Sequence, residues 1–364
     1  MKLCYVLSYR DPRYTRTASL LAALGHIDGI EIIEVRNRRL GLLRYPETLW
    51  KLFRTRLVHK PDVFLLGFRG HEIFPFVRLI TWRRPLVFDE FINLYEWVVE
   101  ERGHLAATHP AARLIRAFSA ACVHRAELVI TDTPQHLAYT AAIHDLDTDR
   151  LGWVYVGADE ATFVPVPHEP DLDGPLTVLF YGNMHPLHGI DVILDAAEIL
   201  RALPVRFTII GGRGTEVGAG LERRVRAERL TNVSYEDWVD YDELPSRIAS
   251  ADVCLAGPFG GTVQARHVIT GKAFQFAAMA KPMVVGALDG SFPFTAGVDS
   301  IVIEQGSAPA LASALRWCLD HRADLPAIGR EGRALYEREF SSVALAERLA
   351  ALLLPLRATN PGAA

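Results

Sequence analysis

A loop in the second half of the chain combines glycines with groups that can hold a phosphate. It follows an apolar run typical of a buried strand and precedes a pattern with the period of an amphipathic helix. The first N–H groups of a helix have no partner within it, and the helix dipole adds partial positive charge. We therefore expect a nucleotide phosphate to bind here, through Gly182, Asn183, Met184 and His188. A tight turn without a ligand is the alternative interpretation.

A lysine stands at a second predicted helix start. Thr270, Gly271 and Lys272 open a short helical pattern that ends before Pro282. At this position the Lys272 ammonium and the helix N–H groups could together neutralise a phosphate group, and such electrostatic stabilisation is usually the largest contribution where a reaction develops charge. A solvated helix start is the alternative.

Two further loops carry weaker candidates. Gly212 and Arg213 lie in the loop 211–218, which follows a predicted strand but does not satisfy the G-x-G-x-x-G spacing. Arg213 is nevertheless a nearby cation for a phosphate. Trp238 stands at the end of another predicted strand, where its ring could stack on a nucleotide base or pack in the core.

The elements that must position these residues alternate as in an α/β protein. Predicted strands are 3–7, 30–35, 62–66, 85–88, 128–131 and 152–155, then 177–181, 206–210, 232–235, 253–256, 282–285 and 300–303. Such alternation indicates mostly parallel sheets with helices on both faces. The proline-rich segment 164–175 between the two sets is typical of a linker. We therefore predict two doubly wound domains, 1–166 and 167–340, followed by a helix over 341–358.

Composition supports two cores and excludes several classes of protein. The chain has 364 residues and is 50% hydrophobic, which suffices for two domains. A net charge of -4 gives no general attraction to nucleic acid. Four widely spaced cysteines form no metal-ligand pattern, and the start is too short and too soon charged for a signal peptide. A reduced, cytoplasmic protein without a metal site is expected.

Several motifs, taken in order, resemble family-4 glycosyltransferases of the GT-B fold (glycosyl transferases group 1). They are Pro186-Leu-His-Gly-Ile-Asp191, Leu244-Pro followed by Ala251-Asp-Val253, Phe276-Ala-Ala-Met-Ala-Lys-Pro-Met-Val284, and Gly157-Ala-Asp-Glu-Ala-Thr-Phe-Val-Pro165. The resemblance implies two Rossmann-like domains facing across a cleft. The first domain would hold a hydroxyl acceptor (a glycan, a lipid-linked or a small molecule), the second a nucleotide-diphosphate sugar, and the final helix would cross back to the first. It also implies retaining transfer of a hexose-like unit.

The departures from the family pattern put some roles in doubt. The family's Glu-x7-Glu pair falls on His267 and Gln275, so neither carboxylate is kept. Gln275 can still hydrogen-bond a ribose hydroxyl, and His267 could contact the donor sugar. Asn183 and His188 stand where the family has an Arg and a Lys on the diphosphate. A non-catalytic homologue acting as a binding or scaffold subunit, and a sugar-nucleotide epimerase or hydrolase, therefore stay open as alternatives.

The first domain offers one candidate catalytic residue. By strand order Asp89 stands where the family often has a His beside the reacting sugar, and a carboxylate there could orient or deprotonate an acceptor hydroxyl. Glu90, Glu96, Glu100 and Glu101 are expected to form a solvated helix face. No D-x-D pair lies in a suitable loop. We therefore expect metal-independent transfer, with the nucleotide sugar as a donor substrate and no cofactor.

The segment 36–60 is strongly basic and also rich in leucine and aromatic residues, against the single acid Glu47. A helix of this composition can lie on an anionic bilayer, in which case the protein would be peripheral at the inner membrane face and the acceptor could be lipid-linked. The alternative is an amphipathic helix packed on its own sheet with a charged outer face.

Overall fold

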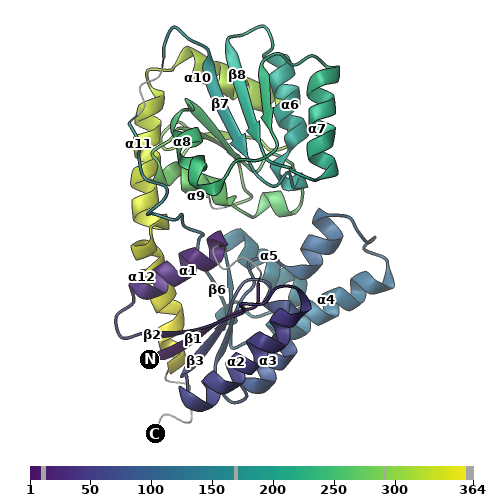
Figure 1. Cartoon of the computed structure of the whole chain (residues 1–364), viewed down its shortest axis with the longest axis vertical. Helices are drawn as coiled ribbons and strands as arrows, with labels where there is room; N and C mark the ends of the chain where they lie inside the picture. Colours follow the sequence, from purple (N-terminus) through teal and green to yellow (C-terminus); the bar gives the residue numbers. More distant parts are fainter. Residues whose placement is uncertain (10–13, 168–170, 291, 358–364) are drawn as a thin grey trace. The chain divides into compact units, whose positions relative to one another are not determined.

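A computed structural model of the chain describes residues 1–9, 14–167, 171–290 and 292–357. The chain divides into two compact units (Figure 1). Unit 1 comprises Met1–Gly157 with Phe340–Ala364, and unit 2 comprises Ala158–Glu339. The division falls before the predicted boundary at 166, and Pro165, Val166 and Pro167 line a pocket together with residues of unit 2. Residues 168–170 of the predicted linker and residue 358 of the predicted last helix lie outside the described residues.

Unit 1 is built on a parallel sheet in the order β2-β1-β3-β4-β5-β6. Its strands are β1 (Lys2–Leu7), β2 (Glu31–Arg36), β3 (Val63–Leu66), β4 (Leu86–Asp89), β5 (Leu128–Thr131) and β6 (Leu151–Trp153). Its helices are α1 (Thr15–Gly25), α2 (Arg44–Val58), α3 (Phe74–Ile80), α4 (Pro110–Val123), α5 (Pro134–His144) and α12 (Ser342–Leu353). A π-helical segment, η3 (Glu96–Glu101), lies between β4 and α4.

The helices of unit 1 lie on two faces of its sheet. The chain moves one way from β1 to β2 and the other way from β2 to β6. Because parallel crossovers are right-handed, α1 lies on one face and α2, α3, α4 and α5 follow one another on the opposite face. One core cluster agrees with this placement: Leu52 of α2, Phe74 of α3 and Cys122 of α4 pack with Phe64 and other strand residues. On the other face, α12 packs against α1.

Unit 2 contains a second parallel sheet in the order β12-β11-β10-β7-β8-β9. Its strands are β7 (Leu176–Tyr181), β8 (Val205–Ile210), β9 (Val233–Glu236), β10 (Val253–Gly257), β11 (Met283–Gly286) and β12 (Ile301–Ile303). Its helices are α6 (Ile190–Ile199), α7 (Glu216–Ala227), α8 (Leu244–Ala249), α9 (Gly271–Ala278), α10 (Ala308–Asp320) and α11 (Leu325–Leu335). Counted from β9, this is the Rossmann order 3-2-1-4-5-6, in which the direction of winding reverses between β7 and β10.

Every predicted strand overlaps an observed one, and the predicted α/β class with two doubly wound units is confirmed. The prediction succeeds because strands that are buried on both faces of a parallel sheet read as continuous apolar runs. All four cysteines are buried and free. Within the described ranges, no helix combines the length and the apolar composition that crossing a bilayer requires.

Candidate functional site

The phosphate-binding candidates of unit 2 surround the point where its sheet reverses winding. Ligands of open parallel sheets bind beyond the carboxyl ends of the strands at such a point. The loops after β7 and β10 are joined there by their backbones: the N–H groups of Phe259 and Gly260 donate to the carbonyl of Leu187 over 3.1 and 2.9 Å. A Cβ on Gly189, whose φ is +63°, would lie 2.6 Å from the backbone carbon of Phe259. Only glycine allows this approach.

The loops after β7 and β8 are equally close to each other. A Cβ on Gly211, at φ +125°, would lie 2.1 Å from the carbonyl oxygen of Gly182. A Cβ on Gly212 would lie 3.0 Å from Cγ of Met184, which is buried. Met184 therefore fills space beneath the glycines, whereas Asn183 beside it is exposed. The glycines let the ends of β7, β8 and β10 approach one another, and they leave backbone groups at the surface of the candidate site.

Lys272 is the cation nearest to Gly182 in this arrangement. Its Nζ donates a hydrogen bond to His188 Nδ1 over 3.2 Å and lies 5.0 Å from the centre of the Phe180 ring. A Cβ on Gly182 would lie 3.4 Å from the same Nζ and 3.6 Å from His188 Nε2. The structure thus brings together three residues that the sequence predicts as phosphate ligands.

The electrostatics of the Lys272–His188 pair favour the binding of an anion. Burial lowers the pKa of the Lys272 ammonium to about 7. Burial, followed by the charge of Lys272, holds the pKa of His188 well below its usual range. His188 is therefore a neutral acceptor at neutral pH, and it does not compensate the charge of the ammonium. An anionic group bound at Gly182 would supply that compensation.

The start of α9 contributes backbone donors beside Lys272. Thr270 is its N-cap residue, but its hydroxyl makes no capping bond and donates instead to the carbonyl of Ala256 over 2.7 Å. This bond attaches the start of α9 to β10. The first N–H groups of α9, from Gly271 onward, are thus left without the side-chain acceptor that a cap usually provides. Together with Lys272 they form the positive end of the site.

Gln275 lies one turn further along α9 and is also buried. Its Oε1 accepts a hydrogen bond from the hydroxyl of Tyr181, at the end of β7. Burial raises the pKa of Tyr181 well above its ordinary value, so the hydroxyl keeps its proton and donates. With Oε1 occupied, Gln275 presents amide N–H groups as donors, which the glutamate of the family pattern could not do.

The remaining candidates of unit 2 are Trp238, Arg213 and His267. Trp238 is 51% exposed, so the core interpretation of this residue is wrong, and its ring lies 5.4 Å from the guanidinium of Arg213. Arg213 is itself exposed and ion-paired with Asp237 over 3.4 Å. His267 is buried and follows the short helix η7 (Gln264–Arg266). The roles of these three residues as ligand contacts stay predictions.

In unit 1, Asp89 forms a buried ion pair. Its Oδ1 accepts hydrogen bonds from Arg16 Nε and Nη2 over 3.1 and 2.8 Å. Burial raises the pKa of Asp89, although the charge of Arg16 opposes this. The same guanidinium donates to the carbonyls of Val154 and Thr131, so it links α1 to the ends of β5 and β6. Asp89 Oδ2 is buried and has no hydrogen-bond partner among the described residues.

The acidic residues after Asp89 do not form the solvated face that we expected. Glu90, Glu96 and Glu101 are buried, and only Glu100 is exposed. The prediction is wrong because the chain folds into the unit at this point: the side chain of Asn93 accepts from the N–H of Glu96 over 3.1 Å and donates to Glu90 Oε1 over 3.1 Å.

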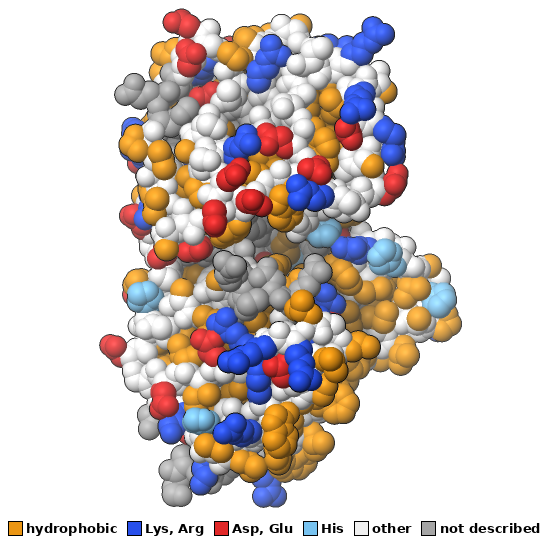
Figure 2. Space-filling view, viewed as in Figure 1, with side chains coloured by type: hydrophobic (Ala, Val, Ile, Leu, Met, Phe, Trp, Pro, Cys, Tyr) orange, Lys and Arg blue, Asp and Glu red, His pale blue; other side chains and the backbone are white. Residues whose placement is uncertain are grey.

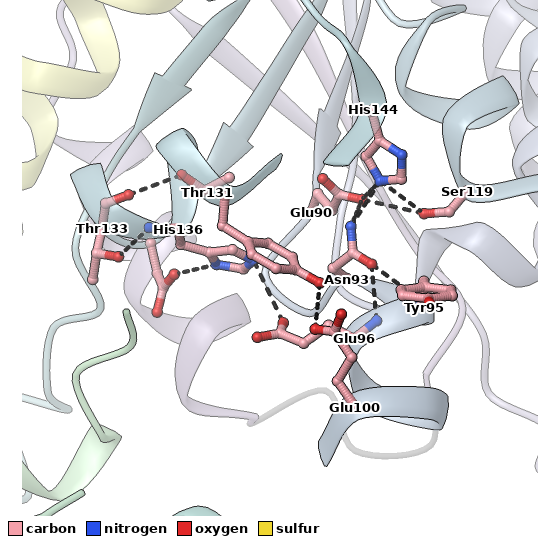
Figure 3. Close-up of polar contacts among 12 residues, drawn as sticks. Glu90, Asn93, Tyr95, Glu96, Glu100, Ser119, Thr131, Thr133, His136 and His144 are labelled. Atoms are coloured by element: carbon pink, nitrogen blue, oxygen red, sulfur yellow. Dashed lines mark hydrogen bonds and ion pairs between the residues drawn. The ribbon is translucent and has the colours of Figure 1, made fainter. Parts of the chain in front are cut away.

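These buried acids belong to a network of polar side chains that the sequence analysis missed (Figure 3). On one side, His144 lies 3.7 Å from Glu90 Oε1 and hydrogen-bonds Asn93. On the other, Asp132 Oδ1 is 2.6 Å from His136 Nδ1. Burial disfavours the His136 imidazolium, but the hydrogen bond and charge of Asp132 outweigh it and raise the pKa of His136 to about 9. The sequence signal that could have revealed this network is an Asp and a His four residues apart just after a predicted strand.

Whole-chain comparisons with solved structures show the fold. Sucrose-phosphate synthase from Thermosynechococcus elongatus is 15% identical, with a TM-score of 0.73 over 98% of this chain and 99% of that one. Alr3699/HepE from Anabaena in complex with UDP-glucose is 16% identical, with a TM-score of 0.69 over 98% of this chain and 100% of that one. The two parallel sheets and these likenesses show the GT-B fold.

A family model agrees with the fold. Residues 175–321 match the family described as Glycosyl transferases group 1, which confirms the predicted resemblance for unit 2. Over 155 residues the chain is also 27% identical to WcaI of Escherichia coli (strain K12), a glycosyl transferase provisionally assigned to colanic acid biosynthesis. This match covers 40% of the chain and 36% of WcaI, so the chain spans about a third of that relative.

Proposed function

We propose that this protein is a glycosyltransferase that moves a hexose-like sugar from a nucleotide-diphosphate sugar to a hydroxyl acceptor. The observation that carries the proposal is the buried ammonium of Lys272 beside Gly182 and the start of α9, at the point where the sheet of unit 2 reverses winding. HepE was solved with UDP-glucose. A UDP-sugar is therefore the first donor to test.

In the proposed reaction, the bond between the sugar carbon and the diphosphate oxygen breaks, and its electron pair goes to the diphosphate. The acceptor oxygen forms the new bond to the same carbon, with retention of configuration, and its proton passes to the carboxylate of Asp89. Lys272 and the first N–H groups of α9 stabilise the charge that develops on the diphosphate, without a metal ion. Gln275 donates to a ribose hydroxyl, and His267 contacts the donor sugar.

Asp89 is proposed to act on the acceptor through Oδ2. A buried carboxylate oxygen with no partner among the described residues is expected to accept a hydrogen bond from water or a ligand. Arg16 holds the other oxygen and fixes the orientation of the carboxylate.

The protein is proposed to act in the cytoplasm, with a peripheral contact at the inner membrane face through residues 36–60.

A ligand screen tests the function directly. We expect thermal unfolding of the protein to shift upward with one nucleotide among UDP, GDP, dTDP and ADP and with its sugar conjugates, because a ligand of the folded state stabilises it. Product analysis with the stabilising sugar then separates the possibilities. Transfer to an added hydroxyl acceptor supports the proposal. Release of free sugar alone indicates a hydrolase, an isomerised sugar nucleotide indicates an epimerase, and binding without turnover indicates a non-catalytic homologue.

A further inference from the structure

The outer face of α2 carries an apolar and aromatic stripe. Trp50, Phe53 and Leu57 lie on one stripe of the helix and are 66%, 46% and 58% exposed. Thr48 and Leu52 on the opposite stripe are buried against the unit. The helix packs on its own sheet, as the alternative interpretation of the segment 36–60 expects, but its outer face is not purely charged. Single exposed apolar side chains are ordinary, but a stripe of this kind indicates an interaction surface.

The neighbouring helices extend this surface. Phe76 and Leu79 of α3 and Trp82 just after it are 57%, 70% and 63% exposed. On α4, Leu114 is 72% exposed, and Phe118 is exposed too. Because the crossovers place α2, α3 and α4 side by side on one face of the sheet, their outer faces form one layer. Figure 2 shows hydrophobic side chains gathered over the part of unit 1 where Figure 1 places these helices.

The charge of this surface is opposite to that of the whole chain. The chain has a net charge of -4, yet α2, α3 and α4 contain a single acidic residue, Glu47, which is ion-paired with Lys51. Arg38, Arg39 and Arg54 are exposed and make no ion pair within the described ranges. These cations lie beside the apolar stripe of α2 and have no acidic partner there.

Two further arginines add positive charge near the junction of α2 and α3. Burial, followed by the charge of Arg84, lowers the pKa of Arg56. Arg56 Nε is buried and has no hydrogen-bond partner in the part of the chain that the structure describes. Two guanidinium groups that repel each other at the junction of α2 and α3 would be stabilised by a shared anionic oxygen, such as that of a phosphate ester.

We infer that the outer faces of α2, α3 and α4 dock on a lipid bilayer rich in anionic headgroups, with Trp50, Phe53 and Leu79 entering the interface. Tryptophan and phenylalanine with flanking arginines are the composition that the bilayer interface accommodates best. The docking places the hydroxyl acceptor in the membrane as a lipid-linked molecule. The acceptor assignment rests on the proposed glycosyltransferase function, whereas the docking itself does not.

Vesicle flotation with the full chain tests the docking. We expect binding to phosphatidylcholine vesicles that contain phosphatidylglycerol, weak binding to phosphatidylcholine alone, and release at high salt. Each cation near the surface contributes about 1 kcal/mol, which is about fivefold in affinity. Arg54→Glu removes one attraction and adds one repulsion, so binding falls about 25-fold. Trp50→Ser with Phe53→Ser weakens binding at least as much.

Matched controls come from the exposed surface of unit 2. Arg226→Glu on α7 and Trp317→Ser on α10 change the same residue types and leave vesicle binding unchanged. Circular dichroism and thermal melting establish that each variant is folded. Absence of wild-type binding, equal binding to both vesicle types at high salt, or equal loss in the controls would overturn the inference.

Light scattering covers the other occupant of this surface, a second copy of the chain. If the wild-type protein is a dimer that Trp50→Ser dissociates, and no vesicle binding is found, then the surface binds a second copy of the chain and the bilayer inference is refuted. The vesicle experiment and the test of the proposed function can fail separately. Vesicle binding with no response to any sugar nucleotide refutes the transferase alone, and transfer to a water-soluble acceptor without vesicle binding refutes the docking alone.

Discussion

Replacing Lys272 by methionine should make the protein more stable and less able to bind a nucleotide diphosphate. The side chain is buried, its ammonium has no carboxylate partner among the residues that the structure describes, and its hydrogen-bond partner His188 is neutral. Methionine keeps the length and the apolar stem of lysine and removes the charge. The charge therefore destabilises the folded state, and we expect that its function is to bind the diphosphate of the donor.

The magnitude follows from the pKa. Burial lowers it from 10.5 to about 7. One pKa unit corresponds to about 1.4 kcal/mol, so the folded state loses up to about 4 kcal/mol at neutral pH relative to an unfolded chain whose lysine is protonated. The penalty is complete below about pH 7, where both states are protonated. It shrinks as the pH rises from 7 toward 10.5, because only the unfolded state still binds the proton.

Denaturant unfolding and calorimetric titration with UDP measure both effects. We expect Lys272→Met to raise the free energy of unfolding by about 2–4 kcal/mol at pH 7, by a smaller amount at pH 9, and to lower UDP affinity about tenfold or more. Wild-type affinity should itself fall between pH 7 and 9, since the free protein must take up a proton to bind the anion. The affinity of the variant should not depend on pH in this range.

The control is Lys281→Met. Lys281 is also buried in unit 2, but it donates to the carbonyl of Ala249 over 3.1 Å. We expect UDP affinity to be unchanged in this variant. A less stable Lys272→Met protein at pH 7, or a stability difference that does not vary with pH, would refute the argument from burial. Unchanged UDP binding by Lys272→Met would refute the assignment of the diphosphate to this place.

Three further substitutions test the site and its supports. Gly189→Ala should destabilise unit 2 by more than 1 kcal/mol in denaturant unfolding, because its Cβ would lie 2.6 Å from backbone; a stability equal to wild type would contradict the close approach of the loops. Arg16→Met leaves Asp89 buried and unpaired, so it should cost about 3–5 kcal/mol, and acidification should recover part of it; equal loss at all pH values would argue against the ion pair. In Asp132→Asn, the pKa of His136 should fall from about 9. The raised pKa of His136 contributes about 3 kcal/mol to wild-type stability; this contribution is complete below pH 6.5 and is lost as the pH rises through 9. A variant whose stability has an unchanged pH profile, or an unshifted NMR titration of His136, would contradict this.

Sequence patterns predicted the strands and several ligand candidates, but not how the candidates meet. Lys272 and His188 are 84 residues apart, and each was predicted from its own loop and helix start. Their contact depends on the strand order, which puts β10 beside β7. The acids after β4 were misread because a charged run next to a helical period looks the same whether it faces solvent or turns inward, as Glu90 and Glu96 do.

The sequence by itself determined the alternation of apolar runs, hence two doubly wound units, and the glycines and lysine that we propose as phosphate ligands, since local propensity and the chemistry of side chains are properties of short segments. Only the tertiary structure decided which side of α2 is covered. The helix carries apolar residues on two stripes, and periodicity cannot tell which of them packs against the sheet. Packing of Leu52 into the core leaves Trp50 and Phe53 exposed. In the same way, burial, which no short segment determines alone, makes the charge of Lys272 costly in the free protein.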